Sequence, residues 1–165
     1  MEQHTHGHGG HAPDAGPMER RALTRLAISA TLHCLTGCAI GEVLGMVIGT
    51  ALGWSDGATI ALAVALAFVF GYALTIAPVL RSGLPLRAAV RVALAADTVS
   101  ILVMEVVDNG IMLLIPGAMD AGLAAPLFWG SLAFALAVAF AVTVPVNRAL
   151  IGRGMGHAVV HHYHH

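Results

Sequence analysis

The sequence predicts an all-α membrane protein with four transmembrane helices and with both the N- and C-termini in the cytoplasm. Of its 165 residues, 58% are hydrophobic and only 10% are charged, and the mean hydropathy is +0.82. A soluble domain is typically about 25% charged. With a net charge of -1 and only two cysteines, the composition also excludes a nucleic-acid-binding module, a disordered chain and a disulfide scaffold.

Four apolar stretches are each long enough to cross a hydrocarbon layer of about 30 Å as a helix. They lie near Leu26–Leu52, Ala58–Leu80, Ala88–Asn109 and Leu123–Val146. Arginines flank the outer ends of this array and the middle connection, whereas the first and third connections contain none. Under the positive-inside rule the arginine-bearing ends are cytoplasmic, and an even number of spans agrees with this assignment. The arginines are Arg20, Arg21, Arg25, Arg81, Arg87, Arg91, Arg148 and Arg153.

We divide the chain into a disordered His-rich tail over residues 1–17, a four-helix transmembrane domain over 18–153 and a second His-rich tail over 154–165. Nine of the ten histidines lie in the tails, where flexible clusters of imidazole groups chelate nickel, copper or zinc. A purification tag is the alternative, although neither tail is a plain polyhistidine run. These histidines are His4, His6, His8, His11, His157, His161, His162, His164 and His165.

The first predicted span carries the thiols. Cys34, Cys38 and Glu42 recur every four residues and therefore share one face of a helix. Four glycines, Gly37 to Gly49, recur at the same spacing beside them and predict close packing of another helix. Small buried hydrophobic side chains are the alternative interpretation of the cysteines. His33 points about 100° away from Cys34 and is a less secure member of a site.

The third predicted span carries acids where a membrane helix should avoid charge. Asp97, Glu105 and Asp108 each cost from about 2.5 kcal/mol upward at a helix centre. Met104 and Asp108 lie within about 20° of Asp97, and Asn109 lies at the edge of this face. A protonated polar network that joins helices is the alternative to a ligand site. The acids outnumber the deep bases, so the sequence leaves a cation unaccounted for.

The thiol and acid faces also match in depth. Cys34 lies about 12 Å into its span and Asp97 about 13 Å, while Glu42 and Glu105 lie about 24 and 25 Å in. The two faces can therefore form a ladder across the membrane. Thiolate and thioether sulfur favour Cu(I), whereas thiolate with imidazole or carboxylate favours Zn(II). We expect copper as the first choice and zinc as the second.

Three segments, HCLTGCAIGEVLGMVIG, DTVSILVMEVVDN and VNRALIGRGMGHAVVHHYHH, resemble a bacterial membrane family catalogued as domain of unknown function 4396. The resemblance runs from about Thr31 onward and implies a multi-pass protein of the bacterial inner (cytoplasmic) membrane. It also implies copper, because relatives include copper oxidases and chains joined to copper-binding domains. The positions that match the family motifs are His33, Cys34, Gly37, Cys38, Glu42, Gly45, Met104, Glu105, Asp108 and Asn109.

The leading hypothesis is a membrane protein, not an enzyme, that binds and transports a transition metal as a homo-oligomer in the lipid bilayer. The metal ligands would be His33, Cys34, Cys38, Glu42, Asp97, Met104, Glu105, Asp108 and Asn109, with no nucleic acid as a partner. Transport would be passive or coupled to an ion gradient, because no nucleotide-binding loop is present. The alternatives are a proton or cation channel and an assembly subunit that docks a partner such as a copper oxidase. A redox enzyme is unsupported because three residues, rather than two, separate the cysteines.

Overall fold

The structure, a computed structural model, describes residues 17–81, 83 and 85–153. Within these ranges the regular structure is entirely helical and consists of α1 (Pro17–Ala51), α2 (Asp56–Arg81), α3 (Leu86–Leu114) and α4 (Pro126–Gly152). The predicted all-α fold is therefore confirmed for the described part of the chain. The nine tail histidines lie outside the described residues.

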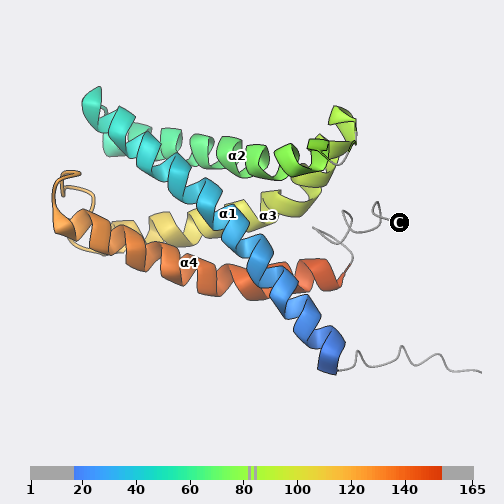
Figure 1. The fold of residues 1–165 in the computed structure, drawn as a ribbon. Coiled ribbons are helices and arrows are strands. Elements are labelled where there is room, and N and C mark those ends of the chain that lie inside the picture. The colour runs from blue at the N-terminus through green and yellow to red at the C-terminus, as the bar shows by residue number, and fades with distance from the viewer. Residues whose placement is uncertain (1–16, 82, 84, 154–165) are drawn as a thin grey trace, which may run out of the picture.

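The helices are antiparallel along the chain and joined by short connections, so that alternate connections lie at opposite ends of the bundle (Figure 1). In Figure 1, α1 crosses the other helices obliquely, with α2 on one side and α4 on the other. Helix α1 packs most extensively against α2 and much less extensively against α3.

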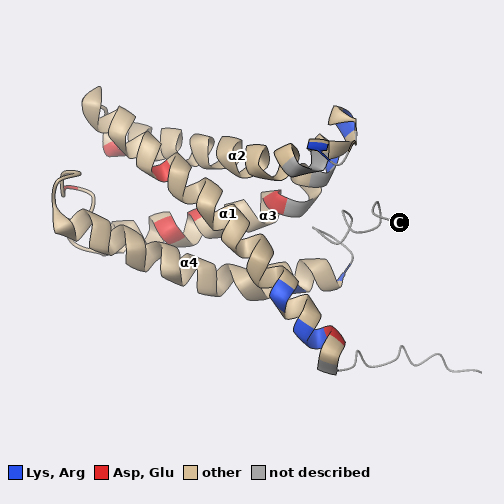
Figure 2. Ribbon diagram, in the orientation of Figure 1, with Lys and Arg blue, Asp and Glu red and all other residues tan. Residues whose placement is uncertain are grey.

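Helix α1 begins earlier than the predicted span. Its 35 residues extend from Pro17 to Ala51, which corresponds to a length of about 50 Å at about 1.5 Å per residue. The segment that contains Arg20, Arg21 and Arg25 is thus continuous with the apolar part of α1. Figure 2 shows the arginines gathered at the end of the bundle where α1 begins, α4 ends and α2 joins α3.

The prediction of four membrane spans is confirmed for three helices. Helices α1, α2 and α4 are long and apolar enough to cross a membrane, whereas α3 does not meet that criterion. The reason is its charge, because α3 contains Arg87, Arg91, Asp97, Glu105 and Asp108 within 29 residues. All three acids are nevertheless buried between the helices. Hydropathy alone ignores the direction in which a side chain points.

The glycines of α1 pack against α2, as their spacing predicts. A Cβ atom on Gly41 would lie 2.2 Å from the backbone nitrogen of Ala67, and one on Gly45 would lie 2.4 Å from the Cα of Ala63. Only a glycine permits the two backbones to approach so closely. The helix that packs closely on these glycines is therefore α2 of the same chain.

Three clusters of buried side chains follow one another along the bundle. The first contains Ala27, Ala30 and Ile151 near the arginine-bearing end. The middle cluster contains both cysteines and Met104, and the last lies beneath the connection between α3 and α4. The predicted ligand residues are concentrated from the middle cluster toward the end opposite the arginines.

Candidate metal site

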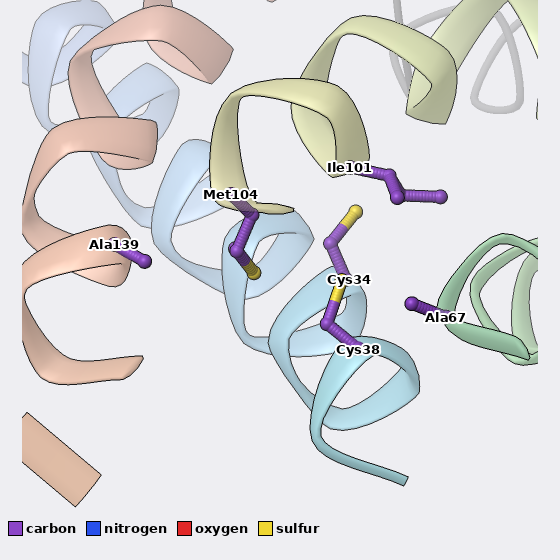
Figure 3. Close-up of a cluster of buried hydrophobic side chains, with 6 residues drawn as sticks. All are labelled: Cys34, Cys38, Ala67, Ile101, Met104 and Ala139. Atoms are coloured by element: carbon purple, nitrogen blue, oxygen red, sulfur yellow. The ribbon is translucent and has the colours of Figure 1, made fainter. Parts of the chain in front are cut away.

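Three sulfur-containing side chains form the centre of the candidate site. Cys34 and Cys38 lie one turn apart on α1, and Met104 of α3 extends toward them in the same buried cluster (Figure 3). Their exposed fractions are 1%, 0% and 0%. Both thiols are free. We refer to Cys34, Cys38 and Met104 as the sulfur set.

Each thiol also faces an acid of α3. The Cys34 Sγ donates a hydrogen bond to Asp97 Oδ1 at 3.7 Å, and the Cys38 thiol interacts with the carboxyl group of Glu105. The predicted match in depth between Cys34 and Asp97 is thus confirmed. The two faces that were derived from helical periodicity do meet inside the bundle.

Glu42 and Asp108 form a carboxyl pair further along the same face. Their exposed fractions are 4% and 2%, and their side chains interact with each other. Neither oxygen of Glu42 accepts a hydrogen bond from a donor within the described residues. Two ionised carboxylates offer only acceptor oxygens, so this pair requires a proton or a cation between them.

The pairing of side chains between α1 and α3 differs from the pairing that the depth estimate predicted. The sequence placed Glu42 level with Glu105, whereas the structure brings Glu42 to Asp108 and Glu105 to Cys38. Helical side chains lean toward the N-terminus of their helix, so the long Glu105 side chain can reach back toward the level of Cys38. Asp108, which lies almost one turn further along α3, then faces Glu42.

Asn109 and His33 occupy the margins of the site. The Asn109 Nδ2 donates hydrogen bonds to the backbone oxygen of Glu105 at 3.0 Å and to Glu105 Oε2 at 3.2 Å. Asn109 therefore orients a predicted ligand. His33 is only partly buried and, as the next residue to Cys34 on a helix, leaves α1 in another direction.

A buried polar network that the sequence analysis missed joins α1, α3 and α4. The Ser100 hydroxyl donates a hydrogen bond to Asn147 Oδ1, and Asn147 Nδ2 donates one to Thr31 Oγ1 at 2.8 Å. All three residues are buried. An amide inside the apolar helix α4 was the available signal, since polar side chains at membrane depth usually have a partner.

The donor atoms are distributed along the bundle rather than gathered at one point. Over residues 17–81, 83 and 85–153, no three His, Cys, Asp or Glu side chains form a group that could hold a metal ion. The sulfur set differs because its third donor is a thioether. Two thiols and one thioether are soft ligands of the kind that favours Cu(I).

The fold and the site define an all-helical protein with apolar helices long enough for a membrane and with acids and thiols buried between them. The chain belongs to the family described as domain of unknown function (DUF4396), which it matches over residues 24–156. The match includes nearly all of the four helices and confirms the resemblance seen in the sequence motifs. No curated protein and no solved structure matches the chain.

Proposed function

We propose that this protein binds Cu(I), with Zn(II) as the second choice, and passes the metal through the membrane along the facing sides of α1 and α3. The observation that carries the proposal is the sulfur set, in which two free thiols and a thioether share one buried cluster. Soft ligands in a buried site favour Cu(I) over hard cations. The role is that of a carrier and not of an enzyme.

The neighbouring acids support transfer along the bundle. Asp97, Glu105 and the Glu42–Asp108 pair provide oxygen atoms on either side of the sulfur set. A series of weak binding sites lets an ion enter and leave, whereas a single closed binding site would retain it. Asp97 and Glu42 would serve as proton carriers or transient ligands before and after the sulfur set.

We further propose that α3 is the fourth membrane span. Its acids are buried, while from Leu94 onward the exposed large side chains among its described residues are apolar and suit contact with lipid. These exposed residues include Leu94, Leu102, Val106 and Leu113. With the arginine-bearing end in the cytoplasm, both termini are cytoplasmic, in the inner membrane of a bacterium.

A homo-oligomer remains part of the proposal, because a bundle of four helices usually needs neighbours to enclose a pathway. Its interface is not the glycine face of α1, which α2 covers. The two histidine tails would collect or receive metal at the cytoplasmic side.

The test is the metal content and coordination of the full-length protein in detergent after loading with Cu(I). We expect X-ray absorption to show copper–sulfur scattering that is clearly weaker in a Cys34→Ser/Cys38→Ser variant. Thr36→Ser/Thr50→Ser is the matched control, because both threonines lie on the exposed face of α1. The tails are the same in all three proteins, so the difference in copper content isolates the buried site. Equal copper–sulfur scattering in the wild type and the cysteine variant contradicts the proposal.

The Glu42–Asp108 pair favours a second candidate function, a proton pathway. Two buried carboxyl groups that interact with each other are suited to exchange protons. Loss of both thiols distinguishes the two functions. A proton pathway survives in the Cys34→Ser/Cys38→Ser variant reconstituted in vesicles, whereas copper transport does not.

A further inference from the structure

A small cavity near the end of the bundle opposite the arginines brings together groups that the sulfur set does not include. It has a volume of about 20 Å³ and is lined by residues of all four helices and of the connection that follows α3. A space of this size holds one water-sized molecule or ion. Its lining includes Glu42, Asp108 and the three methionines Met46, Met112 and Met119.

The acids give this cavity the character of a cation site. Glu42 is 4% exposed, lines the cavity and has two oxygens without a hydrogen-bond donor from the described residues. Asp108 lines the same space and leaves its Oδ1 without a donor from those residues. Buried carboxylate oxygens without donors are strongly unfavourable unless a proton or a cation neutralises them. A single monovalent cation balances one of the two carboxylates.

The methionines specify which cation fits. Met46 comes from α1, Met112 from α3 and Met119 from the connection after α3, and all three belong to one hydrophobic cluster. A proton or a sodium ion gains nothing from thioether sulfur, whereas Cu(I) is selected by it. Three thioethers that come from separate parts of the chain and converge beside two buried acids are more than the filling of a core.

We propose that Met46, Met112 and Met119, together with the Glu42–Asp108 pair, form a second Cu(I) site, the thioether site, between the sulfur set and the end of the bundle opposite the arginines. This inference rests on the proposed function and adds the next binding site along the same pathway. From Cys34 to Met46 the rise along α1 is about 18 Å. The ion thus leaves thiol ligands for neutral thioethers, which bind it less tightly than thiolates and favour its release.

The test uses Ag(I), a stand-in for Cu(I) that does not change oxidation state, with the full-length protein in detergent. Tail histidines are competed with excess free imidazole, and bound silver is measured by elemental mass spectrometry. We expect a Met46→Leu/Met112→Leu/Met119→Leu variant to hold about one equivalent of silver less than the wild type. Leucine and methionine have similar volumes, so the variant should fold. Met18→Leu, at an exposed site of α1, is the control and should retain the wild-type silver content.

Two comparisons separate the thioether site from the sulfur set. The Cys34→Ser/Cys38→Ser/Met104→Leu variant lacks the sulfur set, so silver–sulfur scattering that remains in it supports the thioether site. This measurement does not depend on the folding of the methionine variant. The thioether site is refuted if silver has only nitrogen and oxygen neighbours in the Cys34→Ser/Cys38→Ser/Met104→Leu variant. It is also refuted if the methionine variant holds as much silver as the wild type. If the methionine variant loses silver but the Cys34→Ser/Cys38→Ser/Met104→Leu variant does not, the thioether site is supported and the proposed sulfur set fails.

Discussion

The thiol of Cys34 donates a hydrogen bond to Asp97 Oδ1 at 3.7 Å, across 63 positions of the chain. This contact joins α1 to α3, two helices that pack against each other less extensively than α1 packs against α2. It fixes the level at which the thiol face of α1 meets the acid face of α3. The Cys38–Glu105 and Glu42–Asp108 contacts follow in the same direction along both helices.

A double-mutant cycle measures the Cys34–Asp97 contact. Cys34→Ala and Asp97→Ala should each lower the thermal stability in detergent, and the double variant should lose less than the sum. We expect a coupling free energy of about 0.5–1.5 kcal/mol, the range of a single hydrogen bond. The same cycle between Cys34 and Asp56, an exposed acid at the start of α2, provides the control. Strict additivity for Cys34 and Asp97 contradicts the observed contact.

Met104→Leu tests the third member of the sulfur set. At one equivalent of Cu(I), which the thiols bind more tightly than the thioether site does, we expect the copper–sulfur coordination number from X-ray absorption to fall by about one third, because the leucine side chain has no sulfur, while the fold is retained. Copper binding should weaken rather than disappear, since both thiols remain. Met18→Leu should leave the coordination number unchanged. An unchanged value for Met104→Leu removes the thioether from the site.

Gly41→Ala should destabilise the protein by about 1–3 kcal/mol, because the added Cβ is forced against a backbone that cannot yield locally. The added Cβ would lie 2.2 Å from the backbone nitrogen of Ala67. Gly110→Ala is the matched control on α3, where a Cβ has nothing within 4 Å. There we expect a stability gain of about 0.5–1 kcal/mol, because alanine restricts the unfolded chain. Thermal unfolding of both variants in the same detergent decides the comparison.

Asn147→Leu should reduce stability by about 1–3 kcal/mol, since it leaves the buried Ser100 and Thr31 hydroxyls short of a partner. Asn147 both accepts from Ser100 and donates to Thr31. Adding Ser100→Ala to Asn147→Leu should recover part of the loss, because the hydroxyl that lacks its acceptor is then removed. A loss that stays the same after this second substitution argues that the network contributes little.

Impermeant maleimide labelling tests whether α3 crosses the membrane. Single cysteines are placed at Ser55, Gly83 and Asp120 in the Cys34→Ser/Cys38→Ser background, one in each connection. We expect Ser55→Cys and Asp120→Cys to react from outside spheroplasts and Gly83→Cys to react only after lysis. If α3 does not cross, Asp120→Cys and Gly83→Cys react from the same side.

Much of the architecture follows from local rules that a sequence displays directly. The apolar stretches predicted the helices because an α-helix satisfies its backbone hydrogen bonds internally. The four-residue spacing of Cys34, Cys38 and Glu42 predicted one face, and that face does meet the acids of α3. The glycine spacing likewise predicted a close helix contact, which the structure places against α2.

The partners across the bundle depended on the tertiary structure. Periodicity shows which side chains share a face, but the crossing of α1 over its neighbours decides which pairs meet. Met46 and Asn147 lie within recognised family segments and Met119 lies between two of them, but the motifs do not show which side chains they meet. Only packing brings these three residues to the buried acids and hydroxyls. Helical geometry is local and can be calculated along the chain, whereas register and crossing depend on how all four helices pack at once.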